Sequence, residues 1–176
     1  NVYTEDARGN PIYDWKILDQ IVDTYLARKM KPFVQLGFMP EALSSAPAEV
    51  PYRHFWKPGD PYNDIYTGWT YAPRDYKKWE ELCYQVTRHF VEKYGRAEVE
   101  SWWFELWNEA DIGYWSESVG PAGRGNPLAA QKAQTRREEF NKLYDYTVEG
   151  VRRALPTAKM GGPEVTGGAQ AMLRTF

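Results

Sequence analysis

The stretch VESWWFELWNE, residues 99–109, places a run of aromatic and aliphatic side chains directly before the polar pair Asn108–Glu109. The run predicts a buried β-strand over 99–107, because side chains alternate between the two faces of a strand and short apolar runs are typical of sheet cores. Two polar residues at the end of such a strand face either solvent or a lined pocket. The elements on both sides of the stretch help to decide between the two.

Upstream of this stretch, the sequence predicts a helix and a second strand. Asp14 is placed to cap a helix that ends near Lys29, and Pro32 breaks it before a short buried strand over 33–36. A long loop rich in Pro, Gly, Asp and Tyr follows over 38–72. The apolar positions of the helix form one face: Trp15, Leu18, Ile21, Val22, Tyr25 and Leu26.

Two further helices flank the stretch. One is predicted to carry Pro73 in its first turn and to stop at Gly95. The other is predicted to begin at a capping box of Thr135 and Glu138 and to end at Pro156. The sequence AKMGG then predicts a short strand, followed by a loop and the start of another helix.

Helices and strands therefore alternate along the chain, which is typical of a parallel sheet. The loops after the strands are long and those after the helices are short, as in a (β/α)8 TIM barrel, whose active sites are built from the loops at the strands' C-terminal ends. A doubly wound open sheet is the competing fold, although no loop here has its glycine-rich phosphate-binding turn. A complete barrel needs roughly 250 residues. We therefore predict an α/β fold, a partial barrel with about three strands, in which residues 1–176 are a fragment of a single barrel domain.

Composition excludes several classes of partner. The chain has 176 residues, a formal charge of −2 and no basic run, which argues against nucleic acid and anionic membranes. No stretch approaches the roughly 18 apolar residues of a membrane-spanning helix, and Cys83 is the single cysteine. The sequence begins with Asn and stops inside an apparent helix start, so we expect a piece of a longer chain. Its compartment and oligomeric state stay open.

Aromatic side chains are abundant, with eight Trp and thirteen Tyr. Those in loops either offer flat surfaces for ring-shaped ligands such as sugars or act as packing lids. No His, Cys or carboxylate cluster has metal-ligand spacing and no serine-centred nucleophile elbow occurs, so neither metal nor cofactor is expected. The loop aromatics are Trp56, Tyr62, Tyr66, Trp69, Tyr71, Tyr114 and Trp115.

Glu109 lies where barrel enzymes keep their catalytic groups, at the C-terminal tip of the predicted strand. It shares a strand face with Glu105 and Trp107 if the strand is regular, and Asn108 reaches the same site if the strand end twists or bulges. Apolar walls such as Trp107 and Trp115 would keep a carboxyl group protonated, as a general acid requires. The alternative is a glutamate at a solvated loop start.

Glycoside hydrolysis needs a second carboxylate, roughly 5–9.5 Å from the first. Glu105 is four strand residues away, about 13 Å, so it is better interpreted as a buried carboxylate that could pair with an Arg or Lys from another strand. Asp111 lies on a loop with no element to fix it, and Glu164 is at best a group that lines the pocket. We expect the partner carboxylate outside this sequence.

The sequence WFELWNEADIGYW resembles the WxFEVWNEPN…FW stretch of glycoside hydrolase family 39, which holds β-xylosidases and α-L-iduronidases. Three more blocks resemble that family in the same order and extend the resemblance over almost the whole chain. They are YDWKILDQIVDTYLARKMKPFVQLGFMPEALSS, PRDYKKWEELCYQVTRHFVEKYG and RALPTAKMGGPEVTGG. The resemblance implies that the chain holds about strands 3 to 5 of the barrel with their helices.

The resemblance also implies residue roles. Glu109 would be the acid/base, Asn108 would contact the sugar 2-hydroxyl, and the nucleophile would be a Glu after the seventh strand, outside this chain. The loop after the third strand helps to form the sugar pocket in that family, and Phe55 or Trp56 with His54 is the nearest match. The family usually has Pro after the catalytic Glu, and Pro would restrict Glu109 to an extended backbone conformation. This chain has Ala110, which allows that conformation without enforcing it.

These observations favour a retaining β-xylosidase that acts on β-linked xylosides or xylo-oligosaccharides, with no cofactor and a carbohydrate as its partner. One alternative is an α-L-iduronidase or another glycosidase of the same barrel clan, which would need a cationic contact such as Arg53 or Arg124 for the iduronate carboxylate. The other alternative is a non-catalytic carbohydrate-binding barrel, which Ala110 in place of the usual Pro suggests. Residues 1–176 alone are expected to be inactive.

Overall fold

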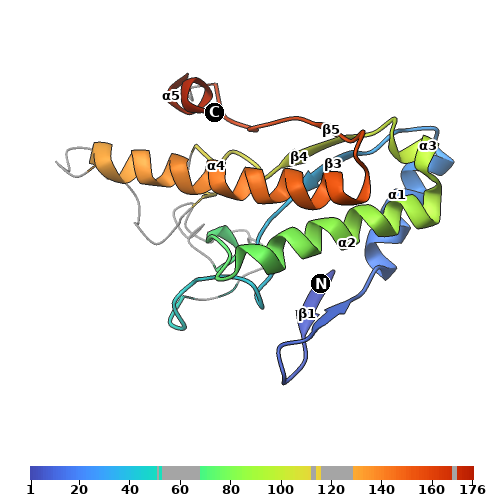
Figure 1. Ribbon diagram of the computed structural model, residues 1–176, viewed down its shortest axis with the longest axis horizontal. Helices are drawn as coiled ribbons and strands as arrows, with labels where there is room; N and C mark the ends of the chain where they lie inside the picture. Colours follow the sequence, from blue (N-terminus) through green and yellow to red (C-terminus); the bar gives the residue numbers. More distant parts are fainter. Residues whose placement is uncertain (51, 53–67, 112–113, 116–128, 168–169) are drawn as a thin grey trace, which may run out of the picture.

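A three-stranded parallel sheet is the larger of the two sheets that the computed structural model shows among its described residues, 1–50, 52, 68–111, 114–115, 129–167 and 170–176 (Figure 1). Its strands are β3 (Phe33–Leu36), β4 (Trp103–Leu106) and β5 (Lys159–Met160), with β4 in the middle. Both pairings are parallel. The fold is thus mixed α/β with parallel strands, as the alternating pattern predicts, and the predicted strands at 33–36 and in AKMGG are confirmed.

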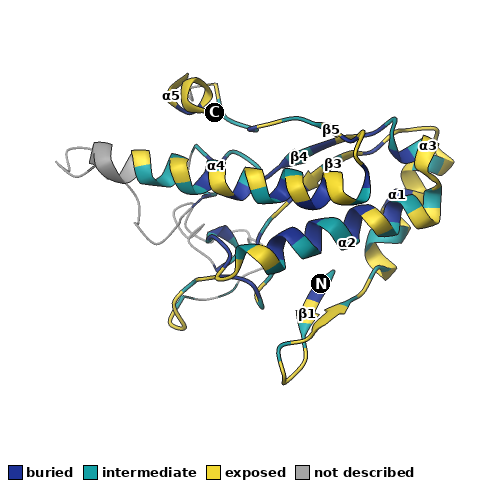
Figure 2. Cartoon of the chain, in the orientation of Figure 1, coloured by how far each residue is buried: buried dark blue, intermediate teal, exposed yellow. Residues whose placement is uncertain are grey.

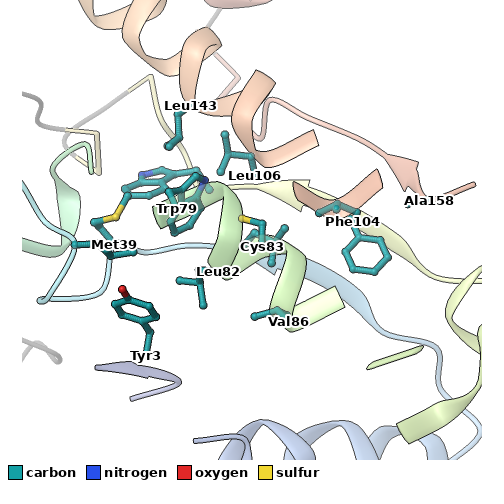
Figure 3. Packing of buried hydrophobic residues seen from close by; sticks show 14 of the residues in the cluster. Tyr3, Met39, Trp79, Leu82, Cys83, Val86, Phe104, Leu106, Leu143 and Ala158 are labelled. Atoms are coloured by element: carbon teal, nitrogen blue, oxygen red, sulfur yellow. The ribbon is translucent and has the colours of Figure 1, made fainter. Parts of the chain in front are cut away.

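Two long helices, α2 (Tyr76–Tyr94) and α4 (Ala129–Ala154), lie side by side and pack against one face of the sheet (Figures 1 and 3). Their apolar stripes enclose Phe104 and Leu106 of β4, which are fully buried. Gly150 allows this close packing, because a Cβ atom there would lie 2.3 Å from the carbonyl oxygen of Glu80. Other core side chains of the two helices are Trp79, Leu82, Cys83, Val86, Phe90, Phe140, Leu143 and Val151.

The start of α2 differs from the prediction, whereas its end agrees with it. Asp75, not Pro73, marks the start of the helix, and its side chain accepts hydrogen bonds from the backbone N–H groups of Lys77 and Lys78. Pro73 lies before the helix and forms an isolated bridge with Ser44. At the other end Gly95 terminates the helix with φ 86°, as predicted, because glycine adopts positive φ without steric cost.

The start of α4 also corrects the prediction. The helix begins at Ala129, so Thr135 and Glu138 lie within it and form no capping box. The sequence AAQKAQ that precedes Thr135 consists of strong helix formers, which extend the helix beyond the predicted cap. Its end, at Ala154 before Leu155 and Pro156, agrees with the prediction.

The segment before β4 is a turn of helix rather than a strand. The predicted strand over 99–107 is shortened to Trp103–Leu106, because α3 (Arg96–Val99) and a following turn occupy the residues before it. Trp102 is fully buried in this turn, where its indole N–H donates to Glu98 Oε1 at 2.8 Å. The apolar side chains that suggested a longer strand are buried through helical geometry instead.

The N-terminal part contains a hairpin that the sequence did not reveal, β1 (Tyr3–Glu5) with β2 (Pro11–Tyr13). The helix that follows, α1 (Lys16–Ala27), starts close to Asp14, which accepts a hydrogen bond from the backbone N–H of Lys16. Of its predicted apolar face only Val22 is buried, and Ile21 and Tyr25 are exposed. Two short helical elements complete the described part: η1 (Gly68–Thr70) and α5 (Gln170–Thr175).

The second face of the sheet is largely exposed, which corrects the prediction that the strand at 33–36 is buried (Figure 2). Phe33 is 58% exposed and Trp103 is 48% exposed. These side chains alternate with the buried ones that face α2 and α4, as strand geometry requires. The sheet therefore has one apolar, covered face and one open face within the described residues.

Candidate functional site

The strands of a parallel sheet end at the same edge, so the segments after β3, β4 and β5 meet there. Asn108 and Glu109 follow β4 at this edge, and both side chains are half-buried. Backbone hydrogen bonds join the neighbouring segments, from Trp107 N–H to the Leu36 carbonyl at 2.9 Å and from Gly161 N–H to the Phe104 carbonyl at 2.7 Å. The Asn108–Glu109 pair thus lies at the C-terminal edge of the sheet, as the sequence predicts.

The backbone around the pair is irregular. Trp107 has φ 67° and Glu109 has φ 47°, a left-handed conformation that costs roughly 1–2 kcal/mol for each residue with a side chain. The two residues interrupt the alternation of β4, so the shared face expected for Glu105, Trp107 and Glu109 in a regular strand does not apply. The indole of Trp107 is fully buried and donates to the Tyr114 carbonyl at 2.6 Å.

Three hydrogen bonds fasten this segment to the loop after β5. Ala110 N–H donates to the Glu164 carbonyl at 3.4 Å, and the backbone N–H of Thr166 donates to Asp111 Oδ1 at 2.9 Å. The hydroxyl of Thr166 donates to the other carboxylate oxygen of Asp111 at 2.5 Å. Asp111 is therefore fixed by a neighbouring loop, contrary to the prediction that no element holds it.

A second group of polar side chains spans the open face of the sheet. The Gln35 amide donates to Glu105 Oε1 at 3.2 Å and also to the carboxylate of Glu164. Burial, followed by the nearby charge of Glu164, raises the pKa of Glu105, and the bond from Gln35 opposes this shift. Within the described residues, the hydrogen-bond partner of Glu105 is the amide of Gln35 on β3, and the Arg or Lys from another strand stays a prediction.

Aromatic rings gather beside the same edge. The ring centroid of Phe38 lies 4.2 Å from that of Trp69, 5.3 Å from that of Trp107 and 5.7 Å from that of Tyr114. Phe38, Trp69 and Tyr114 are half-buried, so each keeps some accessible surface beside this edge. Trp115 is only 1% exposed and packs on Trp107, which makes it a core residue rather than a ligand surface.

Comparison with known proteins decides the family. The model of Glycosyl hydrolases family 39 matches residues 1–176. The chain belongs to glycoside hydrolase family 39. A β-xylosidase from Geobacillus stearothermophilus is 34% identical over 172 residues, which are 97% of this chain and 28% of that protein. The family 39 chain therefore spans well under two thirds of this curated relative.

Solved and further curated relatives agree with this assignment. The crystal structure of a family 39 enzyme from Xanthomonas axonopodis pv. citri superposes with a TM-score of 0.69 at 30% identity, over 99% of this chain and 29% of that one. An α-L-iduronidase from Mus musculus is 33% identical over 86 residues, or 49% of this chain and 11% of that protein. The family 39 chain is thus similar to proteins with two sugar specificities.

The sequence predicts sugar-binding residues in the loop after β3. His54 and Phe55 lie outside the described residues, as do Trp56, Tyr62 and Tyr66. Within the part of the family 39 chain that the structure describes, no three His, Cys, Asp or Glu residues come together as a metal site. In the same part, none of the helices combines the length and the apolar character needed to cross a membrane.

The sequence did not identify two of the polar contacts. Asp111 and Thr166 are 55 positions apart and share no local pattern, so only the fold of this family 39 chain brings them together. Gln35 gave a weak signal, as a polar residue in the otherwise apolar strand FVQL. Its amide bridges two carboxylates at the same edge as Glu109.

Proposed function

We propose that residues 1–176 form part of the (β/α)8 barrel domain of a retaining glycoside hydrolase, a β-xylosidase, with Glu109 as its general acid/base. The observation that carries the proposal is the position of the Asn108–Glu109 pair directly after the central strand of the parallel sheet in a family 39 chain. Barrel enzymes carry their catalytic groups at this edge. The β-xylosidase activity of the Geobacillus relative supports the choice of sugar.

The proposed reaction has two steps. Glu109 donates its proton to the glycosidic oxygen as the bond to the anomeric carbon breaks, and the alcohol leaves while a nucleophilic carboxylate bonds to that carbon. Glu109, now a carboxylate, then takes a proton from water as the water oxygen displaces the enzyme carboxylate with a second inversion. The configuration of the sugar is thereby retained. Asn108 is proposed to bind the 2-hydroxyl, a contact that strengthens in the transition state.

The nucleophile is proposed to lie outside residues 1–176. Glu105 and Glu164 both accept hydrogen bonds from the amide of Gln35. The open face of the sheet, with its exposed Phe33 and Trp103, would be the inner face of the complete barrel. We therefore expect no hydrolysis by residues 1–176 in isolation, because both the nucleophile and most of the barrel would be absent.

The experiment that tests the role of Glu109 is Glu109→Gln in the full-length protein that carries this chain. Glutamine keeps the shape but cannot donate the proton, so kcat/KM should fall about 10²–10⁴-fold for xylosides with poor leaving groups. Dinitrophenyl xyloside, whose leaving group needs no proton, should keep its kcat/KM. Glu92→Gln, an exposed glutamate on α2, is the control. Equal kcat/KM values of wild type and Glu109→Gln on both substrates would contradict the proposal.

An α-L-iduronidase is the second candidate, and the similarity to the mouse enzyme over about half of the chain favours it. Its substrate carries a carboxylate and would require a cationic contact in the pocket. Kinetic comparison of nitrophenyl xyloside with nitrophenyl iduronide on the full-length protein separates the two specificities. A carbohydrate-binding barrel without catalysis, suggested by Ala110 in place of the usual Pro, would hydrolyse neither substrate and would be indifferent to Glu109→Gln.

A further inference from the structure

The loop that carries Glu109 is tied to the loop after β5 by a carboxylate–threonine pair. We infer that Asp111 and Thr166 are positioning residues that hold Glu109 in the orientation needed for proton transfer. This inference rests on the proposed function of Glu109 as acid/base. It assigns a role to two residues that touch neither the substrate nor the reacting atoms in the proposed mechanism.

The geometry of the pair is that of a two-point clamp. The backbone N–H of Thr166 donates to one carboxylate oxygen of Asp111 at 2.9 Å, and its hydroxyl donates to the other at 2.5 Å. Both side chains are half-buried. Hydrogen bonds to a charged acceptor are shorter and stronger than neutral ones, and two of them from one residue also fix the relative orientation of the loops.

The backbone that precedes Asp111 needs such a restraint. Glu109 adopts φ 47°, a conformation that is unfavourable for any residue with a Cβ atom. Such a conformation persists only where the surroundings impose it. The motif of the family that this stretch resembles has Pro and Asn after the catalytic Glu, whereas this chain has Ala110 and Asp111. Ala110 lacks the rigid ring, but its N–H donates to the Glu164 carbonyl at 3.4 Å, a bond that proline cannot make.

The other side of the clamp is itself anchored to the sheet. The carboxylate of Glu164 accepts a hydrogen bond from the Gln35 amide on β3, and the same amide reaches Glu105 on β4. The segment from Glu164 to Thr166 is therefore connected to the first strand of the sheet. Through this segment, the loop that carries Glu109 is linked to β3 of the sheet.

This arrangement has a specific kinetic consequence. A loosened Glu109 would still be present, but less of the bound enzyme would hold its proton in line with the leaving oxygen. Steps that need the proton would slow, and steps that do not need it would be unaffected. A role in general stability alone would instead change the unfolding temperature or affect all substrates equally.

The test is Thr166→Val in the full-length protein, which removes the hydroxyl and keeps the shape. We expect kcat/KM for an alkyl xyloside to fall about tenfold and that for dinitrophenyl xyloside to stay within about twofold, as loss of one charge-assisted hydrogen bond at a positioning residue predicts. Thr166→Ser, which restores the hydroxyl, should recover most of the loss. Asp111→Asn keeps one oxygen acceptor and should give an intermediate loss if Thr166→Val does not fold.

Thr157 offers a matched control, because its hydroxyl donates to Glu100 Oε1 at 2.6 Å and so links the same two chain segments at the opposite ends of β4 and β5. Thr157→Val should leave both substrates unchanged. An equal fall on both substrates in Thr166→Val, no fall on either, or the same pattern in Thr157→Val would overturn the inference. Glu109→Gln in the same assay separates this outcome from failure of the proposed function, since it alone reports whether the proton comes from Glu109.

Discussion

The two ends of β4 are built by different means. At the N-terminal end, α3 and a tight turn bury Trp102 completely against Phe90 and Tyr94, with ring centroids 5.4 Å and 5.6 Å away. Its N–H bonds to Glu98, only four positions earlier. The contacts of the Trp102 side chain are thus apolar or local, and the turn residue Glu100 is right-handed, with φ −61°.

At the C-terminal end the backbone is left-handed at Trp107 and Glu109. The side-chain hydrogen bond there joins Asp111 to Thr166, which is 55 positions away in the sequence. Half-buried Asn108 and Glu109 follow the strand there, and Asp111 is held by a residue of the next loop. The two ends therefore differ in role: the N-terminal end stabilises the fold, and the C-terminal end keeps strained backbone and polar groups in place. Substitutions at the first end should cost stability, and those at the second should also cost chemistry.

The largest effect on stability is expected for Trp102→Ala at the N-terminal end. Removal of a fully buried Trp side chain should lower the free energy of unfolding by about 3–5 kcal/mol, because it leaves a cavity and removes the hydrogen bond to Glu98. Urea unfolding of the full-length protein measures the change, and Ile17→Ala, at a position 61% exposed on α1, is the control. If Trp102→Ala folds with unchanged stability but loses activity on substrates that need a proton, the contrast between the two ends of β4 is wrong.

A smaller effect that touches both properties is expected for Gly37→Ala, just after β3. A Cβ atom there would lie 3.1 Å from the Trp107 ring and 3.3 Å from its Cα atom, and Gly37 has φ 153°. We expect a loss of about 1–3 kcal/mol from crowding together with lower kcat/KM, because displaced Trp107 moves the backbone that carries Glu109.

Gly161→Ala is the matched control for this substitution. Its new Cβ atom would meet only the Phe104 carbonyl oxygen, at an ordinary 3.7 Å. Unfolding and activity should therefore change little. Equal losses in the two variants would show that the contact with Trp107 is not the cause.

The smallest effect is a pH dependence from Glu105, in the body of the strand. Because burial and the nearby charge of Glu164 raise the pKa of Glu105 above its ordinary value, the protonated form favours folding. Its contribution to stability is present below the unfolded pKa and is lost as the pH rises through the folded pKa. Glu105→Gln should therefore stabilise the protein relative to wild type more at about pH 7 than at about pH 4.

Unfolding free energies at the two pH values measure this difference, and Glu92→Gln provides the exposed control. A wild type that gains stability relative to Glu105→Gln as the pH rises would contradict the assignment of the shift. That result would mean that a cation pairs with Glu105 in the complete protein.

The elements with strong local signals could be predicted from the sequence. The strand at 33–36 follows from a short apolar run, and Gly95 marks the end of α2. The start of α4 is set by the helix formers that precede the apparent capping box, and the turn before β4 is set by packing partners that are distant in the sequence. Periodicity does not fix the first residue of an element.

The candidate site divides in the same way. Glu109 was found from its place at a strand end and from a motif, both of which are local. The left-handed backbone at Trp107 and the clamp of Asp111 by Thr166 depend on contacts between loops and leave no pattern in the sequence. The sequence thus identified the candidate acid, and the structure supplies what holds it.

The most direct test of the central claim is the product formed by Glu109→Ala in the full-length protein with dinitrophenyl xyloside and sodium azide. Azide needs no general base, so it should attack the glycosyl-enzyme where Glu109 is missing, restore turnover and yield a xylosyl azide of retained β configuration. Glu92→Ala should form no azide adduct. Failure of azide to accelerate a slow Glu109→Ala variant, or full activity of that variant without azide, would contradict the role of Glu109.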